Sequence, residues 1–190
     1  SHGIKLKSPP HSAGQSYTLT FPQSISADTF LKTDGSGNLS FAAAGGTNTP
    51  YFYAYQSSVT TLSASGFTKV DFQTEYQDSA SAFSSSRFTV PSGQAGKYFF
   101  HFSVGLNTGT NINPIFPILF VNGAENTNGA RIRKYHNGSG GNIQTYAQSA
   151  FFNGGVGDYF EVYFYNGDGS TKDTYNSSQD TFFFGYKIIE

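Results

Sequence analysis

Hydrophobic and polar positions alternate along residues 95–106 with the period of two that is typical of a β-strand. The positions of one alternating set are all apolar: Tyr98, Phe100, Phe102, Val104 and Leu106. The opposite set is mixed and small, with Phe99, His101, Ser103 and Gly105. On a helix these side chains would scatter around the cylinder, whereas on a strand each set occupies one face. Residues 157–165 repeat this pattern of a turn followed by an aromatic strand, so we expect a sandwich of sheets.

Strand-like segments recur from residue 51 onward, and sequences rich in Gly, Asn and Pro separate them. The predicted strands are residues 51–56, 69–72, 87–90, 97–106, 116–121, 130–135, 143–152, 159–165 and 181–189. No segment has convincing helical periodicity, so the predicted fold class is all-β. The last strand is apolar on both faces, which is typical of a strand that is buried on both faces. In a two-layer sandwich, we expect a second subunit to cover it.

The first 46 residues form a separate region in this pattern. Residues 4–7 and 16–21 alternate like short strands, and residues 29–33 and 38–41 flank the turn sequence Asp34-Gly-Ser-Gly37, which predicts a small hairpin. Such short strands bury too little surface to be stable alone. Either they dock on the main domain or they pair with copies from other chains, and we favour the second alternative. We therefore predict a β-rich stem or attachment segment with its linker at residues 1–46, and a main domain at residues 47–190.

Composition and charge exclude several classes of function. The 190 residues carry 11 basic and 12 acidic side chains, and the charged fraction of 12% is about half of the roughly 25% usual in soluble domains. The only cluster of basic residues is Arg131, Arg133 and Lys134, so the charge footprint of a nucleic-acid-binding protein is absent. No apolar run approaches the ~20 residues of a membrane span, so we expect no membrane insertion. The absence of Cys excludes disulfides and cysteine nucleophiles.

The histidines do not form a catalytic or metal-binding pattern. His2 and His11 lie in the N-terminal region, His101 lies on the mixed face of the central strand, and His136 lies in a Gly/Asn-rich loop. No two of them have metal-ligand spacing. We expect His101 to be buried or at an interface, with a hydrogen bond to a neighbouring residue.

The carboxylates likewise have structural explanations. A glycosidase needs two of them close together across a sugar-binding cleft. Asp71 with Glu75, or Asp158 with Glu161, are the pairs close enough in sequence to be considered. We expect Asp158 to cap a turn and Glu161 to face solvent or an Arg across a subunit interface. The sequence also lacks Gly-x-Ser-x-Gly. We therefore predict no catalytic residues and no enzymatic activity.

Two kinds of loop are candidates for binding. Asn166, Asp168 and Asp173 offer hard oxygen ligands and are weak candidates for calcium, although the same residues are good turn formers. Otherwise we expect no cofactor. Tyr beside Asn, Ser and Gly is typical of adaptable recognition surfaces, and it is also common in ordinary loops. The candidate receptor-binding loop residues are Asn107, Asn111, Asn113, Tyr135, Asn137 and Tyr175.

The order of motifs after residue 49 resembles the C1q-like globular domain. These motifs are Tyr51-Phe-Tyr-Ala54, Arg87-Phe-Thr-Val-Pro91, Gly96-Lys-Tyr-Phe-Phe100, Leu119-Phe-Val-Asn122, Gly157-Asp-Tyr159 and Thr181-Phe-Phe-Phe-Gly-Tyr186. The resemblance implies the ten-stranded jelly-roll sandwich of the C1q/TNF superfamily and a compact homotrimer. In such a trimer we expect the interface to contain Phe99, His101, Tyr163, Tyr165, Phe183 and Tyr186.

The N-terminal region resembles segments of tail-fibre and other virion proteins of bacteriophages, especially aquatic ones. The resemblance covers most of residues 3–41, and the pattern Leu31-Lys-Thr-Asp-Gly-Ser-Gly-Asn-Leu39 is its most telling part. It implies a non-enzymatic fibre protein on the virion, exposed extracellularly, with a C1q-like head for host-surface attachment or receptor binding. The expected partners are further copies of the chain, other virion proteins through the N-terminal region, and a host cell-surface glycan or protein. The alternatives are a purely structural trimerisation or decoration cap of a fibre, or a glycan depolymerase.

Overall fold

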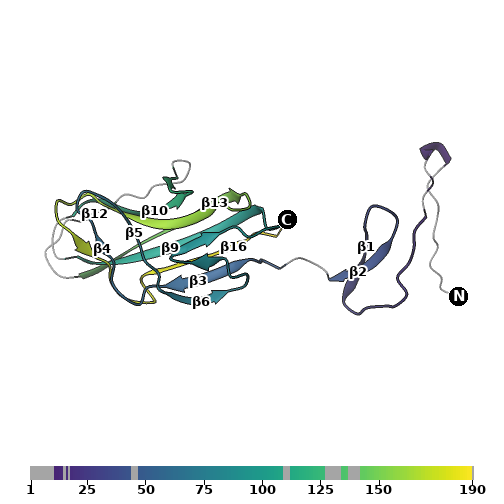
Figure 1. Ribbon diagram of the computed structural model, residues 1–190, viewed down its shortest axis with the longest axis horizontal. Helices are drawn as coiled ribbons and strands as arrows, with labels where there is room; N and C mark the ends of the chain where they lie inside the picture. The colour runs from purple at the N-terminus through teal and green to yellow at the C-terminus, as the bar shows by residue number, and fades with distance from the viewer. Residues whose placement is uncertain are drawn as a thin grey trace. The chain divides into compact units, whose positions relative to one another are not determined.

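The computed structural model describes residues 11–14, 16, 18–43, 47–108, 112–126, 134–136 and 142–189. The predicted strand at residues 4–7 and most of the predicted strand at 130–135 lie outside these ranges. The chain divides into two compact units, Ser1–Gly46 and Thr47–Glu190, and each is described by itself (Figure 1). Within the described residues no helix is long and apolar enough to cross a membrane.

One sheet of the larger unit, here called sheet I, is built around the long central strand. Its strands are arranged in the order β13 (Asn142–Gly154), β9 (Gly96–Thr108), β16 (Phe182–Lys187), β3 (Tyr51–Tyr55) and β6 (Thr74–Asp78). All neighbouring pairs are antiparallel. The predicted central strand is β9, which pairs along its whole length with β13 (Figure 1).

The second sheet, here called sheet II, is built around β14. Its main path is β11 (Ala124–Glu125), β10 (Ile112–Val121), β14 (Tyr159–Asn166), β8 (Arg87–Thr89) and β7 (Phe83–Ser84). Two further strands, β12 (Lys134–His136) and β5 (Gly66–Lys69), pair with β10 and β14 respectively. A separate small ladder joins β4 (Thr61–Leu62) to β15 (Lys172–Asp173).

Phenylalanine rings fill the space between the two sheets. The ring of Phe100 on β9 lies 4.5 Å from that of Phe160 on β14, and Phe52 on β3 stacks at 4.8 Å on Phe88 of β8. All four side chains are buried. The apolar set predicted for the central strand, Tyr98 to Leu106, is at most 1% exposed, so the prediction of a two-layer sandwich with this face inward is confirmed.

The structure also contains strands that the apolar pattern missed. The edge strand β6 has the sequence Thr-Glu-Tyr-Gln-Asp and is mainly exposed, so it carries no alternation of apolar residues. Its pairing with β3 shifts register between Tyr53 and Ala54. The strand predicted at 69–72 is instead β5, which ends at Lys69. Because several strands have only two residues, the ten strands implied by the resemblance do not correspond one to one with β3 to β16.

The smaller unit contains the predicted hairpin. Strands β1 (Thr29–Thr33) and β2 (Leu39–Ala43) are antiparallel, and a 3-10 turn, η1, spans His11–Ala13. The predicted strand at 16–21 is reduced to one bridge, in which Thr20 lies parallel to Asn38. The hairpin turn is closed by Asp34, whose carboxylate accepts hydrogen bonds from Ser36 N at 2.8 Å and from Asn38 Nδ2 at 2.7 Å. These contacts, that of the Asn38 side chain foremost, hold the pKa of Asp34 below its ordinary value.

Candidate functional site

The outer face of sheet I is covered by aromatic side chains, and we call it the aromatic face. Alternation along the strands produces it, because each inward ring, such as Phe52 or Phe183, is flanked by outward ones. Its members on the described strands are Tyr51, Tyr53, Tyr55, Tyr76, Phe99, His101, Phe151, Phe182, Phe184 and Tyr186. Tyr76 and Phe151, at opposite edges of the sheet, are 69% and 71% exposed.

Contacts between the rings fix the shape of the aromatic face. The ring of Tyr53 stacks on Phe182 at 5.8 Å and on Phe184 at 6.0 Å, and Tyr76 meets it edge-on at 6.0 Å. Towards the other edge, Phe99 lies 5.2 Å from Phe151. Aromatic pairs in these geometries stabilise each other beyond the area they bury. The rings of this surface therefore contact one another within the single chain.

Two hollows lie beside Tyr53 on this face. The larger, of about 490 Å³, is lined by Tyr53, Tyr55, Tyr76, Gln77, Ser178, Gln179 and Phe182. The smaller, of about 310 Å³, is lined by Asn48, Tyr51, Phe52, Tyr53, Gln77, Phe184, Gly185 and Tyr186. None of these lining residues is charged. The hollows therefore suit an apolar or amide-bearing surface better than an ionic ligand.

His101 is a polar group near the middle of the aromatic face. Its Nδ1 lies 2.8 Å from Ser149 Oγ, and its ring lies 5.3 Å from Phe184. The expected hydrogen bond to a neighbour is therefore present. Partial burial disfavours the charged imidazolium and lowers the pKa of His101 below 6.5. The folded state therefore favours the neutral ring.

The predicted interface residues occupy three different places. Phe99, His101 and Tyr186 lie on the aromatic face. Tyr163 and Tyr165 lie on the outer face of sheet II, where they stack on Phe120 at 3.9 Å and on Phe116 at 5.1 Å respectively.

Phe183 is the exception, because the prediction that it lies at a subunit interface is wrong. Its side chain is 0% exposed and belongs to the core between the sheets. The run Phe182-Phe-Phe184 is apolar on both faces, so its sequence does not show which ring points inward. The prediction also missed seven tyrosine and phenylalanine residues of the face: Tyr51, Tyr53, Tyr55, Tyr76, Phe151, Phe182 and Phe184. The alternation of Tyr51-Phe-Tyr-Ala-Tyr55 was the signal that identifies the first three of them.

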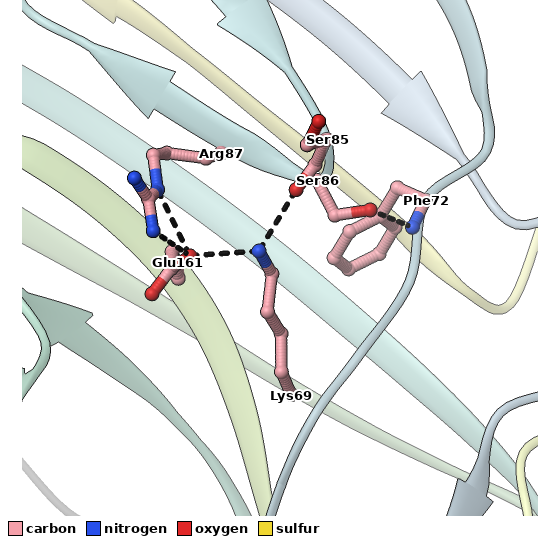
Figure 2. Close-up of polar contacts among 6 residues, drawn as sticks. All are labelled: Lys69, Phe72, Ser85, Ser86, Arg87 and Glu161. Carbon is pink, nitrogen blue, oxygen red and sulfur yellow. Dashed lines mark hydrogen bonds and ion pairs between the residues drawn. The ribbon is translucent and has the colours of Figure 1, made fainter.

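On sheet II, Glu161 is a buried carboxylate held by two cations (Figure 2). Its Oε1 accepts hydrogen bonds from Lys69 Nζ at 2.7 Å and from Arg87 Nε at 3.0 Å. Lys69 also donates to Ser85 O, and the guanidinium of Arg87 lies 3.9 Å above the Tyr159 ring. Burial by itself would raise the pKa of Glu161, but the hydrogen bonds from Lys69 and Arg87 outweigh it and lower that pKa below its ordinary value.

The expectation that Glu161 faces solvent or an Arg of another subunit is therefore wrong. Both of its partners belong to the same chain and come from β5 and β8, so the carboxylate joins these strands to β14. The period-two pattern places Glu161 on the outer face correctly, but it does not show that Lys69 and Arg87 cover it. Glu161 is thus the shared acceptor of two ion pairs within one chain.

Asp158 has the turn-capping role that was expected. Its Oδ2 accepts a hydrogen bond from Gly155 N at 2.7 Å, and its Oδ1 accepts one from Asn122 Nδ2 at 2.8 Å. The Asn122 hydrogen bond is the main cause of a lowered pKa for Asp158. Asp158 and Glu161 thus have separate partners, and nothing in their contacts couples them as a catalytic pair.

The three calcium candidates make contacts that stabilise their own loop. Asn166 is buried and donates to Ser63 O and Ser170 O, and its Oδ1 accepts from Asp168 N. The carboxylate of Asp168 pairs with Lys172 at 3.1 Å.

Asp173 has its own partner, because its Oδ1 accepts from Thr61 Oγ1 at 2.7 Å. Calcium needs six to eight oxygen ligands around one point. Among the described residues, no group of three or more His, Asp or Glu is suited to a metal ion. These contacts therefore favour turn formation over a calcium site.

The candidate loop residues are only partly described. Asn107 is exposed at the end of β9, and Tyr175 is half-buried, with its backbone N donating to Gly105 O at 2.7 Å. Asn113 and Tyr135 lie on the paired strands β10 and β12. Asn111 and Asn137 lie outside the described residues. The receptor-binding role of these loops stays a prediction.

Comparisons with solved structures identify the fold. Murine APRIL at pH 8.0 matches with a TM-score of 0.53 and 15% identity, covering 73% of this chain and 98% of that chain. Eiger TNF from S. frugiperda matches with a TM-score of 0.51 and 12% identity, covering 73% and 91%. The globular domain of zebrafish complement 1qA protein gives a TM-score of 0.48 and 15% identity, covering 73% and 97%. No family model and no curated protein sequence matches the chain. At such identities the similarity concerns the fold alone, and the predicted jelly roll is confirmed at that level as a TNF-like fold.

Proposed function

We propose that this chain is a non-enzymatic structural protein whose jelly-roll unit assembles into a homotrimeric head through the aromatic face. The observation that carries the proposal is this face itself, an aromatic surface with two uncharged hollows. Subunit interfaces are enriched in Tyr and Phe and poor in charge at their centre. A contiguous apolar surface of this kind is unusual on a protein that stays monomeric.

A second copy of the chain is the partner that this surface fits best. The two edges of sheet I differ, because Phe151 projects at one edge whereas the larger hollow lies at the other, between Tyr53 and Tyr76. Contacts between unlike patches of identical chains form rings where the rotation between copies closes, and open filaments where it does not. A trimer is the smallest ring of this kind, and it is also the assembly that the sequence resemblance implies.

The test is the molar mass of the full chain by analytical ultracentrifugation. Wild type is expected to sediment as a trimer, and Phe151→Gln is expected to shift the population towards monomer at micromolar concentration. Because Phe151 is 71% exposed in the single chain, its replacement leaves the core intact. Val156→Gln is the matched control, since Val156 is an exposed apolar residue in the turn before β14. A wild-type chain that is monomeric would falsify the proposal.

We further propose that the trimer is the head of a bacteriophage virion fibre and attaches to a host cell surface. The support is the resemblance of residues 3–41 to phage fibre segments, together with the Asn- and Tyr-rich loops. Fluorescently labelled chain should bind some strains in a panel of aquatic bacteria, and Asn107→Ala with Tyr175→Ala should weaken this binding while the trimer persists. A trimer that binds no strain would favour the structural cap instead.

The absence of enzymatic activity is part of this proposal. Its support is that Asp158 and Glu161 are each held by their own hydrogen-bond partners, with no free carboxylate pair between them. Polysaccharide from any strain that is bound should keep its molar mass after prolonged incubation with the chain, as measured by size-exclusion chromatography. A loss of mass that persists in repeated preparations would establish a glycan depolymerase.

A further inference from the structure

His101 is the histidine of the aromatic face, and it lies inside the sheet rather than at an edge. Its strand, β9, has β13 on one side and β16 on the other (Figure 1). In the register, His101 lies directly between Ser149 and Phe184. The imidazole is 5.7 Å from the ring of Phe182 and 5.3 Å from that of Phe184. A titratable group is therefore set among aromatic rings on the surface that the proposed trimer covers.

The strands beside His101 offer no carboxylate to a protonated imidazole. The residues of β13 that share its face are all uncharged: Ile143, Thr145, Ala147, Ser149, Phe151 and Asn153. From β16 and β3, aromatic side chains face the same way, among them the phenols of Tyr186 and Tyr53. Phenols carry no charge in neutral or acidic solution. Within these three described strands, His101 thus has no partner of opposite charge.

Two charged residues lie on this side of the sheet, towards opposite ends of β9. Lys97 shares the face of His101 and precedes it by four residues. Asp180 Oδ1 accepts a hydrogen bond from Thr145 Oγ1 at 3.1 Å, and Thr145 lies opposite Gly105, four residues after His101. Four residues of a strand span about 13 Å. This exceeds the screening length of about 8 Å at physiological ionic strength, so neither residue compensates a charge on the imidazole.

The proposed trimer would take the imidazole further out of water. Partial burial already lowers the pKa of His101 in the single chain. Loss of the remaining water disfavours a charge that has no partner of opposite sign. The neutral ring, by contrast, keeps its contact with Ser149 Oγ at 2.8 Å. A hydroxyl accepts from a protonated Nδ1 or donates to a bare one, so this contact suits either neutral tautomer.

We propose that protonation of His101 drives the aromatic faces apart, so that mild acid reversibly dissociates the head into folded single chains. This inference rests on the trimer proposed above, because covering the face is what makes the charge costly. If assembly lowers the pKa of His101, association is favoured above the pKa of the single chain and weakens as the pH falls below it. For each unit of that lowering, acid weakens association by up to about tenfold per chain, or about a thousandfold per trimer.

Sedimentation of the full chain at pH 7.5 and pH 5.0 tests this inference. Both values lie above 4.5, the value below which the pKa of Glu161 is shifted, so the ion pairs of Glu161 persist in both solutions. Wild type is expected to be trimeric at pH 7.5, to shift towards monomer at pH 5.0 and to recover on return to pH 7.5. Near-ultraviolet circular dichroism of the tyrosines should show that the acid monomer remains folded.

The variants are compared by how much their association constants change between the two pH values. His101→Gln keeps an amide that can hydrogen-bond with Ser149 but cannot be protonated, so its association constant should change several-fold less than that of wild type. The matched control replaces the other three histidines, His2, His11 and His136, by Gln. This triple variant retains His101 and should keep the full change.

The outcomes separate this inference from the proposed function. A wild-type trimer with the same association constant at both pH values would overturn the switch and leave the trimeric head standing. Loss of the change in the triple variant, or its persistence in His101→Gln, would overturn the assignment to His101. A wild type that is monomeric at pH 7.5 would overturn the head, and the switch with it.

The pKa of His101 itself provides an independent measurement. Nuclear magnetic resonance of chain labelled with ¹³C-histidine gives this value for wild type and for Phe151→Gln, the variant that is expected to be largely monomeric. The pKa should be lower in the wild-type trimer than in the monomer. Equal values in a trimer and a monomer would show that assembly does not bury the imidazole and would overturn the switch.

Discussion

At the scale of single residues, Glu161 shows how strongly one buried charge depends on its neighbours. Its side chain is 3% exposed, and its two partners are partly exposed cations. Replacement by Gln keeps an oxygen acceptor but removes the negative charge that Lys69 and Arg87 share. Glu161→Gln should therefore lower the free energy of unfolding by roughly 1–3 kcal/mol, somewhat less than when a fully buried pair is broken. Urea denaturation measures this, with the exposed Glu75→Gln as a control that is expected to have no effect.

The ionisation of Glu161 predicts that the free energy of unfolding depends on pH. Because the folded-state pKa of Glu161 lies below its ordinary value of 4.5, its contribution to stability is present above that pH. It is lost as the pH falls through the folded-state pKa. Wild type should therefore lose part of its free energy of unfolding in mildly acidic solution below pH 4.5, and the loss should be smaller in Glu161→Gln. Urea midpoints between pH 3 and pH 6 measure the difference, and parallel curves for the two proteins would contradict it.

The pKa of His101 predicts a second change of the free energy of unfolding with pH, at a higher pH than that of Glu161. Burial lowers its pKa below 6.5, so the folded state favours the neutral ring. The corresponding stability is present above pH 6.5 and is lost as the pH falls through the folded-state pKa. His101→Gln keeps a side chain able to hydrogen-bond with Ser149 but cannot be protonated. Its urea midpoint should change less than that of wild type between pH 7.5 and pH 5.5.

At the scale of the elements, the packing between β9 and β16 requires Gly185. A Cβ at this position would overlap the Phe100 ring and lie 2.9 Å from Phe99 O. Both neighbours are fixed, one in the core and one in the backbone of β9. Gly185→Ala should therefore destabilise the fold by about 1–3 kcal/mol. Gly169→Ala is the control, because nothing lies within 4 Å of a Cβ there. Thermal unfolding of both variants tests the difference.

The elements also show what sequence patterns can and cannot predict. The strand β9 could be recognised because one face contacts a core and the other does not. For β6 this signal fails, since Thr74–Asp78 is an exposed edge that needs no apolar side chains. The aromatic face was therefore predicted only in part. Tyr76 lies on the strand that was missed, whereas Tyr51, Tyr53 and Tyr55 lie on a predicted strand whose outward face was not assigned to the interface. Nor does the sequence reveal the partners of Glu161, which come from 92 and 74 residues away.

At the scale of the whole molecule, the proposed trimer couples folding to assembly. A chain that associates only when it is folded becomes more stable against unfolding as its concentration rises. The midpoint of thermal unfolding of wild type should therefore increase with protein concentration, whereas that of Phe151→Gln should be nearly constant. Differential scanning calorimetry over a hundredfold range of dilution tests this. A wild-type midpoint that does not depend on concentration would contradict the coupling.

The register shift in β6 has a consequence for solubility. An exposed edge of a sheet offers unpaired N–H and C=O groups, and a regular edge can extend indefinitely by adding further chains. Beside the shift between Tyr53 and Ala54, the edge strand carries Glu75 and Asp78. Irregular geometry and negative charge both disfavour the addition of another strand at this edge. Growth of the sheet into amyloid-like fibrils is thereby hindered there, while the aromatic face stays available for assemblies of finite size.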